Sequence, residues 1–467
     1  MEDKTKKTVT VRVNGVPMQA TVGSRLSELI GIDQPCGGRG TCGKCRVTVN
    51  GREELACRYT VESDVDVQAD APSEILSESG TEESGRLTEH LCLALDVGTT
   101  TLALSLISLD EGQVVRTVTA TNPQRAFGAD VITRIDYCQR HSVEPLHLAL
   151  IGEINRMIAS LKIADADTLY AAGNATMLHT LFGIDPSPIG VAPYTAAFLD
   201  GKEIDASELG LLGVRRVISL PSIASFVGAD IVAGLHRIGP PKGEKYNLLI
   251  DLGTNAEVVL YSARGGLATA AAAGPCFEGA SISCGMSATE GAITAFTSVN
   301  GIPHCQTVGG LPPRGICGTG LVDVIATLLE LEIIDETGYM EEDYPICEGV
   351  YLSPEDVRQY QLAKSAICSA ILSLMRIEGI GFDEIETMYI AGGFSARINL
   401  PNAVRAGLIP RALADRAVSL LNTALQGTVK YACEGGDLTR FTKRIRYVDL
   451  SADAGFSNLF MENMMFS

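Results

Sequence analysis

The sequence predicts a small α+β module at the start of the chain, followed by a larger α/β domain made of two similar halves. Three observations lead to this prediction. Four closely spaced cysteines lie among the first sixty residues, a polar segment rich in Ser and Glu follows them, and an Asp-x-Gly-Thr motif occurs twice in the rest. With 467 residues, 46% of them hydrophobic, the chain can fill several separate cores.

Composition and charge exclude several functions. The formal net charge of −19 argues against general nucleic-acid binding, which needs clustered Lys and Arg. No apolar run approaches the roughly 18–20 residues that a membrane helix needs, and the polar start does not resemble a signal peptide. We therefore expect a cytoplasmic protein without nucleic-acid or membrane partners, whose 13 cysteines do not form a disulfide framework.

The N-terminal cysteines have the spacing C-x5-C-x2-C-x11-C and surround a glycine-rich loop. Glycine permits positive-φ turns, so several thiolates can point at one metal centre. Thr8–Gly15 and Arg46–Gly51 each predict a strand that ends in an Asn-Gly hairpin turn, one on either side of the loop. The last cysteine follows the second hairpin and can fold back to the loop. The predicted metal ligands are Cys36, Cys42, Cys45 and Cys57.

This pattern resembles that of plant-type ferredoxins, C-x4-C-x2-C…C, with one extra residue in the first spacing and a short last spacing. The resemblance implies an α+β ferredoxin-like (β-grasp) domain over residues 1–70 that holds a [2Fe–2S] cluster. Zinc is an alternative, although zinc ribbons usually have two Cys-x-x-Cys knuckles and only Cys42 and Cys45 have that spacing here. Unligated cysteines are a further alternative. The other nine cysteines have no ligand spacing, and most are predicted to pack in cores.

Residues 71–90 contain many Ser, Glu and Gly and few large apolar side chains. Such a composition predicts a flexible, acidic linker. A tether of this kind would let a small redox module move between an electron donor and an acceptor, although it is also compatible with a merely tolerated connection. The second domain is then expected to cover residues 91–467.

An internal repeat organises this second domain. An apolar strand leads to Asp96-Val-Gly-Thr, and a similar strand leads to Asp251-Leu-Gly-Thr. Later in each half a second pair matches: the strand before Gly173 resembles the strand before Gly392. The halves are expected to cover about 91–245 and 246–467, with an insertion within residues 262–320 of the second half.

Two such hairpins facing each other across a cleft predict a nucleotide site. Asp96 and Asp251 can hold Mg²⁺ and orient a water molecule, and Glu257 is a weaker candidate for positioning that water. Asp230 can face the cleft or cap a helix, and His179 is expected to be structural rather than directed at a partner's cofactor. Glycine-rich and hydroxyl-rich turns let backbone N–H groups approach phosphates. The expected phosphate-binding residues are Gly98, Thr99, Thr100, Gly253, Thr254 and Asn255, and those beside adenosine are Gly392 and Gly393.

These motifs resemble those of the superfamily that contains acetate kinase, sugar kinases, Hsp70 and actin. Asp96-Val-Gly-Thr-Thr and Asp251-Leu-Gly-Thr-Asn match its two phosphate loops, Ala391-Gly-Gly-Phe matches its adenosine loop, and Gly315-Ile-Cys-Gly-Thr-Gly resembles its turn before a connecting helix. The resemblance implies a duplicated RNase H-like ATPase domain over residues 91–467. No Walker A motif is present in the sequence.

A ferredoxin-like module fused to this ATPase fold resembles the reductive activators of corrinoid proteins. The strings Phe226–Ile231 and Gly274–Met286 support the match. The resemblance implies ATP-driven transfer of one electron from a [2Fe–2S] cluster to Co(II) of a corrinoid protein, restoring Co(I). It also implies a low-potential electron donor, Mg²⁺ and a homodimer. Long members carry a middle domain between the two modules, and the short linker predicts that this domain is absent here.

Two other functions are compatible with the same motifs. A redox-regulated small-molecule kinase would use the cleft for phosphoryl transfer, but no sugar or carboxylate pocket can be identified in the sequence. A non-enzymatic, redox-gated nucleotide-binding protein would not need both aspartates, and both are present.

Overall fold

The computed structural model describes residues 8–30, 32, 38–40, 45–69, 83–299, 301–393 and 397–466. Its N-terminal part is a five-stranded mixed sheet with strand order β2-β1-β5-β3-β4, in which β1 and β5 run parallel at the centre. The Asn14-Gly15 and Asn50-Gly51 turns have positive φ at all four residues, as the predicted hairpins require. The elements are β1 (Thr8–Val13), β2 (Val16–Thr21), α1 (Leu26–Ile30), β3 (Arg46–Val49), β4 (Arg52–Leu55) and β5 (Val65–Gln68).

The first repeat contains a six-stranded sheet with strand order β10-β11-β9-β6-β7-β8. Strands β6, β7 and β8 form an antiparallel meander, and β9 pairs with β6 in parallel. The strands are β6 (Leu91–Val97), β7 (Thr101–Ser108), β8 (Gln113–Thr121), β9 (Ala166–Gly173), β10 (Glu203–Asp205) and β11 (Val214–Ser219). The helices are α2 (Val131–Arg140), α3 (Glu144–Ser160), α4 (Ala175–Leu181) and α5 (Ala229–Ile238).

The second repeat has strand order β21-β20-β12-β13-β14-β22, in which β12, β13, β14, β20 and β21 correspond to β6, β7, β8, β9 and β11. Strand β10 at one edge of the first sheet and β22 at the opposite edge of the second have no counterparts. Its strands are β12 (Tyr246–Leu252), β13 (Ala256–Ser262), β14 (Gly265–Ala271), β20 (Ile385–Ala391), β21 (Ala417–Ser419) and β22 (Ile445–Tyr447). Its helices are α7 (Pro354–Glu378), α8 (Leu400–Arg405), α9 (Thr423–Glu434), α10 (Leu438–Thr442) and α11 (Ala454–Glu462).

The repeat extends to individual packing contacts. Gly173 is the last residue of β9 and lies close to β6: a Cβ there would be 2.8 Å from the Val97 carbonyl oxygen. Gly392 takes the equivalent place after β20, where a Cβ would lie 2.2 Å from the Leu252 carbonyl oxygen. The expected duplication of an actin-like and sugar-kinase-like fold is therefore confirmed in topology and in detail.

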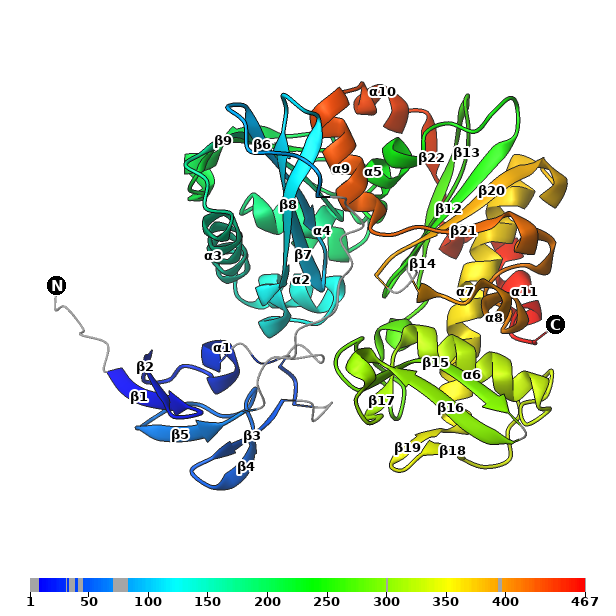
Figure 1. Ribbon diagram of the computed structural model, residues 1–467, viewed down its shortest axis with the longest axis horizontal. Coiled ribbons are helices and arrows are strands. Elements are labelled where there is room, and N and C mark those ends of the chain that lie inside the picture. The colour runs from blue at the N-terminus through cyan, green and yellow to red at the C-terminus, as the bar shows by residue number, and fades with distance from the viewer. Residues whose placement is uncertain are drawn as a thin grey trace.

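The two halves exchange helices, as Figure 1 shows between the two large sheets. Helix α5 belongs to the first half by sequence, yet Ile231 and Leu235 pack in one core with Leu249 and Val259 of the second sheet. Helix α9 belongs to the second half, yet Leu425 packs with β6 and β7. Helix α5 also packs in the core of the first half through Val232 and Ala233, and it lies directly against α9. The two helices thus join the two halves.

The insertion in the second half is larger than predicted. It lies between β14 and α7 and contains a three-stranded sheet, a helix and a hairpin (lower right in Figure 1). The predicted range 262–320 includes β14, which belongs to the repeated sheet, and omits the hairpin. The inserted elements are β15 (Ala292–Val299), β16 (Ile302–Thr307), β17 (Gly315–Ile316), α6 (Gly318–Glu330), β18 (Tyr344–Cys347) and β19 (Val350–Leu352).

Part of the predicted linker lies against the first sheet. Residues 70–82 fall outside the described part of the chain. The N–H groups of Ser84 and Gly85 both donate to the Val114 carbonyl of β8, at 3.0 and 2.9 Å, and Glu83 accepts a bond from the Thr117 N–H at 2.7 Å. We call residues 83–90 the strap. It is ordered here, in contrast to the flexibility expected for the whole of residues 71–90.

Candidate functional site

The predicted aspartates lie at equivalent places in the two sheets. Asp96 and Asp251 are the penultimate residues of β6 and β12, the central strands of the two repeats. Asp251 pairs across the hairpin with Glu257 of β13, whereas the partner of Asp96 in β7 is Ala103. Directly opposed residues in antiparallel strands share a face of the sheet. The second half alone therefore adds a third carboxylate, and the site is chemically asymmetric although the fold is duplicated.

These carboxylates and Asp230 influence one another strongly. Burial, together with the charge of the neighbouring Asp230, raises the pKa of Asp96 to about 7, while a hydrogen bond from Asn422 opposes the shift. Burial raises the pKa of Asp251 to about 7, again with a contribution from Asp230. The pKa of Asp230 itself rises to about 6, mainly through burial. All three residues keep some contact with solvent.

The pKa of Glu257 is raised well above its ordinary value, first by burial and then by the charges of Asp230 and Asp251. Asp230 therefore faces the cleft and repels the other acids of the site. Its Oδ1 accepts a hydrogen bond from the adjacent Ile231 N–H at 2.9 Å in the first turn of α5. A group of acids that resist joint ionisation is a natural place for a cation or for proton transfer.

The first loop is held through its carbonyl oxygens. Asn122 Nδ2 donates to the Gly98 carbonyl at 2.7 Å, and the Asn122 N–H donates to the Thr100 carbonyl at 2.9 Å. Arg134 Nη2 donates to the Thr99 carbonyl at 2.5 Å. Within the described residues, no group accepts a bond from the Thr99 or Thr100 N–H. Amides left in this state can bind phosphate oxygens.

Side chains from later elements also hold this loop in place. Asn174, which follows β9, donates from Nδ2 to Thr99 Oγ1 at 3.0 Å while its Oδ1 caps α4 by accepting from the Met177 N–H at 2.9 Å. The loop thus receives a contact from the segment that follows β9, the strand that pairs with β6 in parallel.

The second loop is bound to a residue of the insertion. The Gly253 N–H donates to the Asn255 carbonyl at 2.9 Å, and Thr254 Oγ1 donates to Glu278 Oε2 at 2.5 Å. Burial raises the pKa of Glu278, while the Thr254 bond and the charges of Arg125 and Arg134 lower it. Because both arginines belong to the first half, Glu278 faces that half across the cleft.

Several site residues were not assigned from the sequence. Glu278, Asn422, Asn174 and Arg134 reach the loops from positions far along the chain. Only the string Gly274–Met286, which contains Glu278, carried any signal, and it indicated a family rather than a role. His179 is structural, as expected: it is buried, its Nδ1 lies 2.7 Å from the Ala175 carbonyl, and its Nε2 accepts from the Ala197 N–H at 2.9 Å.

The predicted adenosine residues Gly392 and Gly393 follow β20 at the same edge of the second sheet as Asp251, with Ala391 in register with Asp251. Residues 394–396, which include the Phe of the matched motif, lie outside the described part of the chain. The position of the two glycines is compatible with an adenosine contact, and their role remains a prediction.

The structure describes two of the four predicted cluster ligands. Cys45 precedes β3 and Cys57 follows β4, both are buried in the core of the N-terminal sheet, and the Ala56 N–H donates to the Cys45 carbonyl at 2.9 Å. Cys36 and Cys42 lie outside the described residues. Over the described ranges, no group of three or more His, Cys, Asp or Glu side chains is arranged to hold a metal ion. Likewise, no helix described there is long and apolar enough to cross a bilayer.

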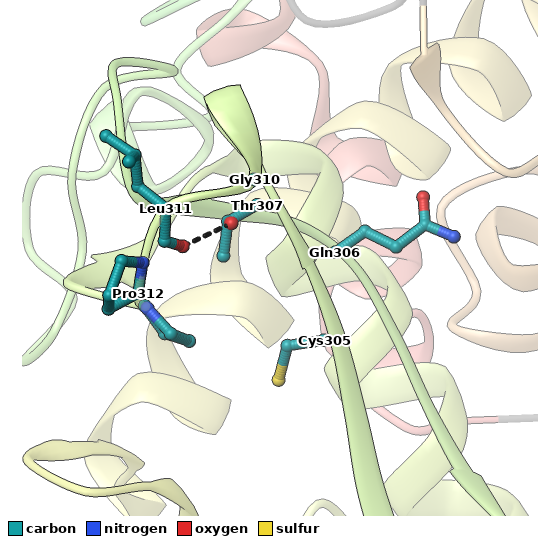
Figure 2. A pocket seen from close by; sticks show the side chains of 7 residues that line it. Cys305, Gln306, Thr307, Gly310, Leu311 and Pro312 are labelled. Carbon is teal, nitrogen blue, oxygen red and sulfur yellow. Dashed lines mark hydrogen bonds between the residues drawn. The ribbon is translucent and has the colours of Figure 1, made fainter.

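A separate hollow of about 530 Å³ opens on the insertion between β16 and the turn after it. Figure 2 shows Leu311 and Pro312 on one side of it and Cys305 below, with Thr307 Oγ1 bonded to the Leu311 carbonyl. Its lining includes no carboxylate or imidazole. The acid group of the cleft, on β6, β12 and β13, is therefore the candidate active site.

Fold and site together define a protein of the actin and sugar-kinase class, with two repeated sheets, exchanged helices and paired Asp-x-Gly-Thr loops. Family models agree: residues 245–467 match the C-terminal, ASKHA domain of RACo, and residues 91–239 match the RACo middle region. The chain belongs to the family of reductive activators of corrinoid proteins.

Named relatives span most of the chain. The corrinoid activation enzyme RamQ of Eubacterium limosum is 29% identical over 80% of this chain and 70% of its own length. The [Co(II) methylated amine-specific corrinoid protein] reductase of Methanosarcina barkeri is 26% identical over 71% of this chain and 68% of its own. A solved reductive activator for a corrinoid, iron-sulfur protein superposes with a TM-score of 0.71 at 25% identity and covers 98% of both chains.

The family models divide the larger domain at the boundary of the repeat. The model of the RACo middle region matches residues 91–239, which form the first of the two repeated sheets. The RACo middle region is thus the first half of the duplicated fold. The expected absence of a further domain between the cysteine-bearing module and Asp96 stays a prediction.

Proposed function

We propose that this protein is an ATP-dependent reductive activator. It would pass one electron from a [2Fe–2S] cluster to Co(II) of a corrinoid protein and restore Co(I), with a low-potential donor supplying the electron. The observation that carries the proposal is the joining, in one chain, of a buried cysteine hairpin to an asymmetric group of acids on a duplicated fold, in a family whose named members activate or reduce corrinoid proteins. This favours activation over the small-molecule kinase and the non-enzymatic alternative.

The N-terminal residues fit a ferredoxin-like role. Strand order β2-β1-β5-β3-β4, with parallel central strands, suits a β-grasp fold, and Cys45 and Cys57 lie together at one end of the β3–β4 hairpin. Cys36 and Cys42 would complete the ligand set. A cluster bound there would supply single electrons at low potential, near −400 mV for the plant type. Burial of both described cysteines would keep those ligands from water.

ATP would be needed because the electron transfer is expected to run uphill. Co(I) is a very strong reductant, and each ~59 mV of unfavourable difference costs a factor of about ten for one electron. Binding and hydrolysis of a nucleotide can bias a two-state cleft by the difference in its affinity for the two states. The contact between α5 and α9, which joins the two halves, suits such opening and closing.

Within the cleft, we assign roles to the chain's own groups. The Thr99 and Thr100 amides and the Gly253–Asn255 loop would bind phosphate oxygens, and Asp96 and Asp251 would hold Mg²⁺, which would offset phosphate charge. Glu257, which lies directly opposite Asp251 across the β12–β13 hairpin, would position an attacking water. Gly392 and Gly393 would border adenosine.

The proposal also includes the organisation of the chain. Residues 1–70 would form the ferredoxin-like domain, residues 71–90 the linker and residues 91–467 the ATPase domain, and the protein would form a homodimer.

The decisive test mixes the reduced full-length protein with a Co(II) corrinoid protein and Mg-ATP, and follows the Co(I) absorption band. Cys42→Ser should abolish electron delivery and leave nucleotide binding intact. Asp251→Asn should leave the cluster spectrum unchanged and stop ATP-dependent activation. Cys305→Ser, at the hollow of the insertion, is the matched cysteine control and should behave as wild type. ATP-dependent phosphorylation of a small molecule with no Co(I) formed would contradict the proposal.

A further inference from the structure

Helix α2 contacts both the first phosphate loop and the segment that carries the cysteines. Residues two positions apart on a helix point to different faces. Arg134 is fully buried and donates to the Thr99 carbonyl of the loop at 2.5 Å. Asp136, on another face, accepts a bond from Arg39 Nη2 at 2.8 Å. One short helix thus connects Thr99 and Arg39, which lie about sixty residues apart in the sequence.

Arg39 lies between Cys36 and Cys42 in the sequence, inside the cysteine loop. Its carbonyl accepts a hydrogen bond from the Arg58 side chain, and Arg58 directly follows Cys57. Arg39 is therefore tied to the segment of the fourth predicted ligand on one side and to α2 on the other. Any movement of α2 against the N-terminal sheet would act first on this residue.

Helix α2 is well suited to move as one body. Asp130 and Thr133 form a capping box at its start, with the Thr133 N–H donating to Asp130 Oδ1 at 2.8 Å. Arg134 also donates from Nε to the Gly128 carbonyl at 2.9 Å, which fixes the segment before the helix. The charge of Arg134 lowers the pKa of Glu278, which belongs to the second half. Helix α2 therefore also faces the second half.

We propose that α2 is the docking site of the cysteine-bearing module within this chain, and that the Arg39–Asp136 ion pair couples that docking to the state of the first phosphate loop. The docking contact stands on its own geometry. The coupling rests on the proposed function, because it assigns a nucleotide to the first loop.

The contact has the strength that a releasable docking needs. The Arg39 and Asp136 side chains are 60% and 30% exposed, and such ion pairs are individually weak. Residues 70–82 connect the N-terminal sheet to the strap, and a chain of this length can reach about 45 Å at most. Tethering at this length raises the effective concentration to roughly the millimolar range, so a weak contact suffices. Arg140 Nη2 also binds Asp136 at 2.7 Å, and the bonds from Arg39 and Arg140 lower the pKa of Asp136.

A charge swap in the full-length protein tests the docking. Arg39→Asp and Asp136→Arg should each raise amide hydrogen exchange several-fold in residues 45–69 and 131–140, and increase the radius of gyration in X-ray scattering. The double variant should restore both values, because it rebuilds the pair with reversed charges. The controls are Arg12→Asp, which disrupts a pair inside the N-terminal sheet, and Asp165→Arg, which disrupts one inside the first half. Single variants that match wild type, or a double variant without rescue, would overturn the docking.

A second measurement tests the coupling. A non-hydrolysable ATP analogue with Mg²⁺ is titrated by calorimetry, and hydrogen exchange is followed in the same samples. We expect the analogue to change exchange in residues 45–69 of the wild type, and to bind Asp136→Arg without this change and with an affinity shifted by the coupling factor, because coupling between two sites is reciprocal. Binding without any change in the wild type overturns the coupling. No binding at all overturns the nucleotide function and the coupling together, whereas the charge swap still decides the docking.

Discussion

At the residue scale, the site is a group of acids whose charges oppose one another. Asp96 and Asp251 have pKa values raised from 3.8 to about 7, and Asp230 has one raised to about 6. The repeat in the sequence pointed to Asp96 and Asp251, because both follow the same motif, whereas Glu257 has no counterpart in the first half. Glu278 and Asn422 reach the site only through folding, since no local pattern links them to the loops.

The raised pKa values predict how stability depends on pH without nucleotide. Between about pH 4 and pH 7 the folded state binds more protons than the unfolded chain. The contribution of these groups to the unfolding free energy therefore falls as pH rises through that window. Asp251→Asn should therefore unfold with a free energy about 1–2 kcal/mol higher than wild type at pH 8, with the difference shrinking toward pH 4. Denaturant titrations at several pH values measure this, and Asp96→Asn should behave alike. A variant equally destabilised at every pH would contradict the prediction.

Asn122 provides a second prediction at this scale. It is fully buried, binds the Gly98 carbonyl through Nδ2, and accepts from the Gln124 N–H at 2.9 Å. Asn122→Ala should cost about 1–3 kcal/mol of unfolding free energy, because it leaves buried polar groups without partners. It should also weaken nucleotide binding, as calorimetry would show, since the first loop loses a contact. Unchanged affinity in a folded variant would separate Asn122 from the loop's function.

At the scale of elements, the sequence predicted the repeated strands well and the insertion less well. The two Asp-x-Gly-Thr hairpins and the strands before Gly173 and Gly392 were found because apolar strands followed by glycine turns leave a clear local pattern. The boundaries of the insertion were misplaced because β14 resembles the inserted strands in composition, and only pairing with β13 assigns it to the repeated sheet. The helix exchange between the halves has no local signature at all.

That exchange depends on one close approach. A Cβ at Gly427 of α9 would lie 1.8 Å from the Ala233 carbonyl oxygen of α5. Gly427→Ala should push the helices apart, lower the unfolding free energy by about 1–3 kcal/mol, and impair ATP-dependent steps that need the halves to move together. Gly152→Ala in α3 is the matched control: the position is exposed with nothing within 4 Å, so alanine should stabilise by about 0.5–1 kcal/mol. Equal effects of the two substitutions on thermal unfolding would show that the crossing is not close in solution.

At the scale of the whole molecule, three bodies are joined by connections of different kinds. The N-terminal sheet has a core of its own, separate from the cores of the two large sheets. The large sheets share helices, so they are expected to fold together, whereas the N-terminal sheet contacts the first half through the Arg39–Asp136 pair. Composition predicted a tether between the N-terminal sheet and the first half. It did not predict at which residue the tether ends, because a segment rich in Ser and Glu can either stay in solvent or pair with the edge of a sheet.

The position of that end can be tested by truncation. The strap pairs with the Val114 carbonyl, and the Arg86 N–H donates to Glu111 Oε2 at 2.9 Å, so it covers part of the edge strand β8. A fragment of residues 83–467 should fold and bind Mg-ATP, because its cores are complete. A fragment of residues 91–467 should have an unfolding free energy about 1–2 kcal/mol lower. It loses the hydrogen bonds that the strap makes, and this loss is partly offset because the strap no longer has to be ordered. Its exposed β8 edge should also make it more prone to association, which sedimentation measures. If the two fragments were equally stable and equally monomeric, the strap would be a passive part of the connection, and the span available to the N-terminal sheet would be correspondingly longer.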